Sequence, residues 1–195
     1  MASVKSNSCL ISGTRVYIGL PQANDGGELI ALNRASQNFH RGWVSPPTTP
    51  KQFQQYWENC KRDDFKGLLI RHKSDRAILG VFNLSQIFYG KFKSAYMGFY
   101  LGAAYAGQGY MTEALGLALQ YAFKKLKLHR VEANIQPENA KSIALVKRAG
   151  FTLEGYSRRY LKIGSRWRDH ERWAILVEDW QKLKTQELSD AKQES

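Results

Sequence analysis

Two glycines, Gly107 and Gly109, stand directly before an apolar helical pattern. The segment at residues 99–113 reads Phe-Tyr-Leu-Gly-Ala-Ala-Tyr-Ala-Gly-Gln-Gly-Tyr-Met-Thr-Glu, so Gly107 and Gly109 precede the predicted helix. The first N–H groups of a helix have no internal partner, and the helix dipole leaves partial positive charge there. Glycine lets a phosphate approach these amides closely. The turn is suited to holding an anion such as a pyrophosphate, and the pattern also fits a plain tight turn.

Two common phosphate-binding motifs do not fit this segment. A Walker loop has Gly-Lys followed by Ser or Thr, whereas Gly109 is followed by Tyr110. A dinucleotide-binding fingerprint needs a third glycine where Thr112 stands, and it belongs to the first strand of its unit. The sequence therefore supports neither kinase-like nor dehydrogenase-like chemistry.

Hydrophobic periodicity predicts the elements that must position this turn. Strands are expected at 14–20, 68–70, 77–87, 94–101 and 131–135, and a final antiparallel pair at 151–163 and 167–177. Helices are expected at 24–38, 50–63, 111–126 and 142–148. Helices distributed among strands in this way predict a mixed α/β sheet.

The composition bounds the class of protein. The 195 residues carry 29 Lys and Arg against 17 Asp and Glu, a formal net charge of +12. This length suits one domain over 1–195, with a core at about 14–180 and a polar tail at 181–195. No apolar run approaches the roughly 20 residues that cross a bilayer, and the start lacks a signal peptide, so we expect a cytoplasmic protein. Cys9 and Cys60 form neither a metal-binding spacing nor a disulfide framework.

A second segment carries a family resemblance. It reads Asn139-Ala-Lys-Ser142-Ile-Ala-Leu-Val-Lys-Arg-Ala-Gly150-Phe151. This resembles the second cofactor segment of the GNAT superfamily of N-acetyltransferases, and the glycine turn resembles the acetyl-coenzyme A site of that family. The stretch from Gly164 to His170 resembles the RimJ/RimL group of ribosomal-protein N-terminal acetyltransferases, and it is closest to RimJ. The motifs stand in the expected order between about Thr14 and Trp180.

The resemblance implies a GNAT fold, in which a mostly antiparallel sheet is splayed at its middle and acetyl-CoA lies in the gap. The backbone of Phe99, Tyr100 and Leu101 would pair with the pantetheine arm. Asn139 would bind this arm, and Ser142 would lie near its sulfur. The pyrophosphate would be held by the amides of Gly107, Gln108, Gly109, Tyr110, Met111 and Thr112. No metal is expected.

The chain departs from the family pattern at three positions. Ala106 stands where the pyrophosphate motif usually opens with Gln or Arg, and Met111 replaces its last small residue. Val146 stands where other N-terminal acetyltransferases carry a tyrosine acid. Backbone amides and Gln108 must therefore hold the pyrophosphate, and a tyrosine acid is missing from this helix.

Acetyl transfer needs a neutral amine, a donor to the developing oxyanion and a stabilised thiolate. The N–H of Leu101 is the expected oxyanion donor, and the hydroxyl of Ser142 is the expected donor to the sulfur. The sequence offers no clear base. Glu132, Asp169, His170 and a water chain all stay open as acceptors of the amine proton.

The absence of a clear base for the amine proton bears on which kind of amine is the acceptor. An α-amine has a pKa of about 7.7–8.0 and a lysine one of about 10.4, so an α-amine is far more often neutral at pH 7. We therefore expect acetyl-CoA-dependent acetylation of a protein N-terminus, such as that of a ribosomal protein, by a monomer or homodimer without a membrane partner. The basic surface is an expected contact for ribosomal RNA. Two alternatives stay open: acetylation of an aminoglycoside or polyamine, and a non-catalytic module that binds CoA or RNA.

Overall fold

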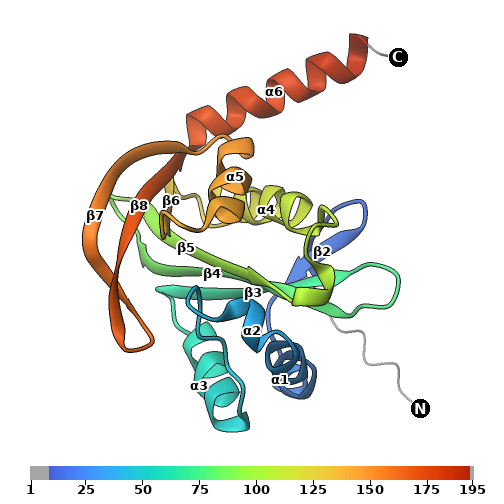
Figure 1. Cartoon of the computed structure of the whole chain (residues 1–195). Helices are drawn as coiled ribbons and strands as arrows, with labels where there is room; N and C mark the ends of the chain where they lie inside the picture. Colours follow the sequence, from blue (N-terminus) through green and yellow to red (C-terminus); the bar gives the residue numbers. More distant parts are fainter. Residues whose placement is uncertain (1–8, 194–195) are drawn as a thin grey trace.

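One eight-stranded sheet organises the protein, with the strand order β1-β2-β3-β4-β5-β6-β8-β7 (Figure 1). The computed structural model describes residues 9–193. Neighbouring strands are antiparallel except for β5 and β6, which are parallel. The strands are β1 (Cys9–Ser12), β2 (Val16–Gly19), β3 (Phe65–His72), β4 (Ile78–Phe88), β5 (Ser94–Leu101), β6 (Arg130–Ile135), β7 (Thr152–Ile163) and β8 (Arg166–Leu176). The mixed, mostly antiparallel sheet predicted from the sequence is confirmed.

Helices cover both faces of the sheet (Figure 1). Thr49 caps α3 with a reciprocal capping box, and Asn139 caps α5. The long helix α6 extends away from the sheet (Figure 1). The α-helices are α1 (Gly26–Ala35), α2 (Gln37–His40), α3 (Pro50–Cys60), α4 (Tyr110–Gln120), α5 (Ala140–Arg148) and α6 (Val177–Gln193). Short 3-10 turns cover Ala23–Asp25 and Ala103–Tyr105, and a π-helical turn covers Tyr121–Lys125.

Side-chain alternation along the strands divides the interior into two cores. Leu69, Val81 and Tyr100 are cross-strand neighbours and pack against α1 and α3. Phe82 and Leu101 point to the opposite face, where α4 and α5 cover a larger apolar cluster. Each strand residue near the site can therefore be assigned to the α1–α3 face or to the α4–α5 face.

The sheet splays open between β5 and β6. The parallel pairing covers only Ser94–Tyr96 on β5 and Arg130–Glu132 on β6. Beyond this point β6 remains paired with β8, and β5 remains paired with β4 as far as Leu101. The two strands thus enclose a gap that widens from Tyr96 toward the end of β5.

Most predicted elements are confirmed, and three local differences are found. The strand β1 is an addition, which pairs with β2 at the sheet edge. The helix expected at 24–38 breaks at Ser36, whose buried hydroxyl accepts a hydrogen bond of 2.9 Å from the amide of Ala103. The helix expected at 111–126 leaves α-helical geometry after Gln120. Among residues 9–193, no helix is both long and apolar enough to cross a membrane.

Candidate active site

The loop at residues 107–112, here called the diphosphate loop, has the backbone geometry that its glycines predict. Gly107 and Gly109 have φ angles of +77° and +81°, which lie in the left-handed region that glycine favours. Gly109 is the N-cap of α4, and the first amide bonded back to it is that of Glu113, at 3.3 Å. The side chain of Gln108 turns away from the loop, since its Nε2 donates to the carbonyl of Ala104 at 2.8 Å. The loop amides are therefore available to an anion.

Arg15 brings a fixed positive charge to this loop. Its Nη1 donates to the carbonyl of Gln108 at 3.0 Å, and its guanidinium lies 4.7 Å from the ring centre of Tyr110. A Cβ on Gly109 would lie 2.9 Å from Nη2 of Arg15. Arg15, from the turn between β1 and β2, thus places a cation beside the loop in which Ala106 stands where the family usually has Gln or Arg. Sequence reasoning missed Arg15 because it lies 93 positions from Gln108.

Glu113 ties the start of α4 to β2. Its carboxylate accepts the amide of Arg15 at 2.8 Å and that of Val16 at 3.2 Å, and it pairs with the Arg15 guanidinium at 3.4 Å. Burial tends to raise the pKa of Glu113, but these hydrogen bonds outweigh burial and the pKa is lowered. The carboxylate is therefore kept ionised, and it holds Arg15 beside the loop.

The register of β5 decides which backbone groups face the gap. Gly102 donates its amide to the carbonyl of Leu79 at 2.7 Å, and Leu101 lies opposite Gly80. In an antiparallel ladder this makes Leu101 a non-hydrogen-bonded position, and by alternation Phe99 as well. The N–H and C=O of Phe99 and Leu101 therefore point toward the gap. The backbone of Tyr100 points toward β4, and its side chain is buried against α1 and α3.

Asn139 and Ser142 meet at the start of α5. The Oδ1 of Asn139 accepts the amide of Ser142 at 3.2 Å, so Asn139 acts as the helix cap. Ser142 is half-buried. The cap fixes the two side chains relative to each other, on the helix that follows β6.

Asp169 and Glu132, two of the three side chains predicted as bases, are engaged in structural contacts. Asp169 is half-buried, and it accepts the hydroxyl of Tyr156 at 2.6 Å and the amide of Arg159 at 2.7 Å. The hydrogen bond from Tyr156 is the largest cause that lowers the pKa of Asp169. Glu132 pairs with Arg130 at 2.9 Å. Asp169 thus braces the irregular segment of β7, and Glu132 shares the guanidinium of Arg130 with Glu154.

His170, the third side chain predicted as a base, is buried in the sheet. Burial lowers its pKa, and its Nδ1 lies 3.0 Å from the carbonyl oxygen of Arg168. Because a carbonyl only accepts, Nδ1 carries the hydrogen there. Tyr160 packs against His170, and burial together with neighbouring Tyr96 raises the pKa of Tyr160 to about 12. The structure does not bring Glu132, Asp169 and His170 together as one catalytic group.

The α1–α3 side of the gap is lined by polar and small residues, here called the polar face. Alternation places Glu132, Asn134 and Gln136 on it, because Ala133 and Ile135 point into the α4–α5 core. On β5, the residues of the polar face are Tyr96, Gly98 and Tyr100. A Cβ added to Gly98 would meet no atom within 4 Å, so the floor of the gap is open there.

Comparisons with known proteins establish the family. The profile of the acetyltransferase (GNAT) domain family matches residues 15–152. Probable N-acetyltransferase YjcK of Bacillus subtilis is 32% identical over 178 residues, which is 87% of this chain and 98% of that protein. Ribosomal protein uS5-alanine N-acetyltransferase of Escherichia coli is 40% identical over 106 residues, 54% of this chain and 55% of that protein.

A solved structure agrees with these relatives. RimJ of Mycobacterium smegmatis in complex with CoA-disulfide superposes with a TM-score of 0.77 at 25% identity, covering 84% of this chain and 82% of that one. The chain belongs to the GNAT acetyltransferase family and is an N-acetyltransferase, as the sequence predicted. Its relatives place it with the RimJ/RimL group. More distant relatives include spermidine N(1)-acetyltransferase of Vibrio cholerae, which is 23% identical over 142 residues.

The residues present fit acetyl-CoA, the acetyl donor of this family. Left-handed glycines expose the loop amides, and Arg15 adds a cation where a diphosphate would lie. The N–H and C=O of Phe99 and the N–H of Leu101 offer the hydrogen bonds of an unpaired strand edge, which suits the amides of a pantetheine arm. Within residues 9–193, no group of three or more His, Cys, Asp or Glu side chains is placed to hold a metal ion.

Proposed function

We propose that this protein transfers the acetyl group of acetyl-CoA to the N-terminal α-amine of a protein, with a ribosomal protein as the type of acceptor. The diphosphate loop and Arg15 would bind the diphosphate, and the gap-facing edge at Phe99 and Leu101 would bind the pantetheine arm. Asn139 would contact this arm, and the hydroxyl of Ser142 would donate to the departing sulfur. The N–H of Leu101 would stabilise the negative charge that develops on the thioester oxygen.

The observation that carries the choice of acceptor is the absence of a free carboxylate on the polar face, as far as residues 9–193 show. Glu132 faces the gap, but its carboxylate is held in an ion-pair cluster in which Arg130 also binds Glu154. A polyamine or aminoglycoside carries several positive charges, and binding it would require acidic groups that face the gap. A protein N-terminus brings a single amine, and about a seventh of such amines are neutral at pH 7. The polar face therefore suits an α-amine better than a polycation.

Two matched peptides test this proposal. They share one sequence with one lysine; in the first the α-amine is blocked, and in the second the lysine is blocked. The difference in amine pKa predicts that kcat/KM is on the order of 100-fold higher when the α-amine is free. Release of CoA thiol gives the rate, and mass spectrometry locates the acetyl group. Faster acetylation of lysine, or of spermidine as a third acceptor, would contradict the proposal.

The basic surface supports ribosome contact as a second part of this proposal. A net charge of +12 favours phosphate-rich particles over basic ribosomal proteins free in solution. Co-sedimentation with ribosomes should then be strong at low salt and fall steeply as salt increases. No binding at low salt would remove ribosomal RNA from the proposal and leave the acetyl transfer untouched.

A further inference from the structure

His40 occupies the end of the gap with one ring nitrogen engaged and the other unpaired. The side chain is 4% exposed, and its Nε2 lies 2.8 Å from the carbonyl oxygen of Leu101. Because a carbonyl oxygen only accepts, Nε2 must carry the hydrogen, which leaves a lone pair on Nδ1. Nδ1 is buried and has no hydrogen-bond partner among the described residues. A buried acceptor of this kind is costly unless something donates to it.

The segment around His40 is fixed across the gap at several points. Ser36, just before α2, accepts the amide of Ala103 after the end of β5. Just beyond His40, the carbonyl of Gly42 accepts Nε2 of Gln136, which follows β6, at 2.7 Å. The segment therefore bridges the two diverging strands. His40 contacts Leu101, and the N–H of Leu101 faces the gap.

Unpaired buried acceptors are concentrated on this side of the sheet. Five buried side-chain atoms in the described part of the chain lack a partner, and four belong to Asn33, His40, Tyr100 and Asn134 on the α1–α3 side. The amide of Asn33 is oriented by its Nδ2, which donates to the carbonyl of Pro47 at 2.8 Å, so its free atom is an acceptor too. The free acceptor at Nδ1 of His40 suits a ligand that donates an N–H bond.

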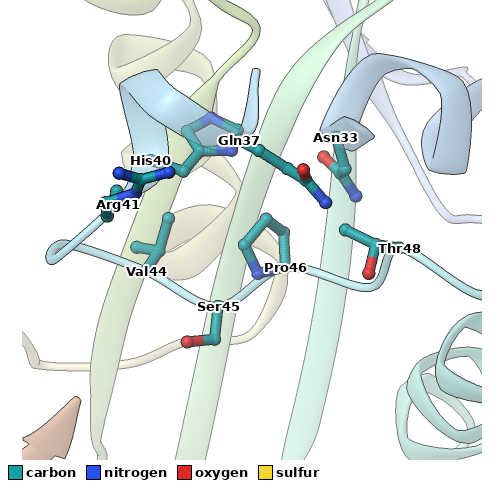
Figure 2. A pocket seen from close by; sticks show the side chains of 8 residues that line it. All are labelled: Asn33, Gln37, His40, Arg41, Val44, Ser45, Pro46 and Thr48. Carbon is teal, nitrogen blue, oxygen red and sulfur yellow. The ribbon is translucent and has the colours of Figure 1, made fainter. Parts of the chain in front are cut away.

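A hollow of about 270 Å³ connects these residues. Figure 2 shows Gln37 between His40 and Asn33, above the loop that carries Val44 and Pro46. The segment that bridges β5 and β6 contributes Gln37, His40 and Arg41 to the lining of the hollow. An amine held by acceptors at this place would be next to the backbone of Leu101.

The geometry points to Nδ1 of His40 as the group that binds the acceptor amine and takes its proton. This inference rests on the proposed function, because it needs the thioester to lie along β5. The amine nitrogen bonds to the thioester carbon, the carbon–sulfur bond breaks, and one amine proton passes to Nδ1. The proton then leaves through solvent as the sulfur of CoA takes one up, so the net reaction converts an amine and a thioester into an amide and a thiol. The Nε2–H bond to Leu101 fixes the tautomer in which Nδ1 carries the lone pair of the neutral ring.

The competing explanation is that His40 only braces Leu101. Two substitutions separate the explanations. His40→Gln places an amide N–H near the position of Nε2 and can keep the bond to Leu101, but it removes the basic Nδ1. His40→Ala removes both. His129→Gln is the matched control, because His129 is half-exposed and pairs with Glu178 away from the gap.

We expect His40→Gln to lower kcat by about 100-fold, the usual scale of a general base. Its dissociation constant for CoA, measured by calorimetry, and its melting temperature should stay near wild type. Added imidazole should restore part of the activity of His40→Ala, which a purely structural role would not allow. His129→Gln should keep the wild-type kcat.

The experiments distinguish failure of the inference from failure of the proposed function. If His40→Gln retains kcat within about threefold of wild type while His40→Ala loses it, His40 is a brace and the inference is wrong. If wild-type protein binds CoA but acetylates no free α-amine, the proposed function fails and the inference fails with it. Loss of kcat in His40→Gln with intact CoA binding supports the inference.

Discussion

The two sides of the gap differ in the groups they present: the diphosphate loop presents mainly backbone N–H groups, and the polar face presents mainly side chains. In the proposed function, the diphosphate loop would bind through backbone N–H groups, glycine conformations and the dipole of α4, with Arg15 as its added charge. The polar face presents side chains from strands that are distant in sequence, and the buried His40 stands at its end. If the proposed function holds, donor binding depends on backbone conformation, whereas acceptor chemistry depends on tertiary placement. A substitution on one side should then leave the other side unchanged.

Gly109→Val should have the largest effect. A β-branched side chain is strained at a φ of +81°, and its Cβ would lie 2.9 Å from the guanidinium of Arg15. We expect the affinity for CoA, measured by calorimetry, to fall by more than about 100-fold because the loop amides lose their alignment. Gly116→Ala is the control, since its Cβ meets no atom within 4 Å and alanine favours a helix. Near-wild-type CoA affinity in Gly109→Val would show that the loop does not bind the diphosphate.

Arg15→Ala should weaken CoA binding by about 10-fold, because one charge-assisted contact to the diphosphate is lost from a half-exposed position. The loss should shrink as salt increases. With acetyl-pantetheine, a donor that lacks the diphosphate, kcat/KM should be the same for variant and wild type. Arg62→Ala, which removes a surface cation paired with Asp64, is the control. An equal loss with both donors would mean that Arg15 acts through the fold of β2 and α4.

The sequence was sufficient for the diphosphate loop because its chemistry is local. Left-handed glycines and the start of α4 lie within a few residues, so spacing alone predicts their geometry. The same holds for Asn139 and Ser142, which meet through a helix cap three positions apart. The strands other than β1 were predicted from their apolar, β-branched and aromatic residues, and the splayed sheet followed from the family resemblance.

The polar face was not predictable because its contacts are long-range. His40 lies 61 positions from Leu101, and nothing near His40 in the sequence marks the bond between them. The break at Ser36, which turns α2 toward the gap, depends on the amide of Ala103 and overrides the helical pattern of residues 24–38. Asp169 was proposed as a base from its charge alone, and its engagement with Tyr156 and Arg159 follows from an irregularity in β7.

Gly98→Val should have the smallest effect of the three substitutions, and it should change only the binding of the acceptor. Gly98 is exposed on β5, a Cβ there meets no atom within 4 Å, and valine suits a strand, so the melting temperature should not fall. The new side chain would stand on the floor of the gap between Tyr96 and Tyr100. We expect the KM for a peptide acceptor to rise about fivefold, the cost of crowding one or two methyl groups. The dissociation constant for CoA should stay within twofold of the wild-type value, because the backbone edge at Phe99 and Leu101 is unchanged.

Gly27→Ala, at an exposed glycine on α1 with open space around its Cβ, is the matched control. A rise in the CoA dissociation constant with an unchanged peptide KM would place the donor, not the acceptor, over Gly98 and would reverse the assignment of the two sides.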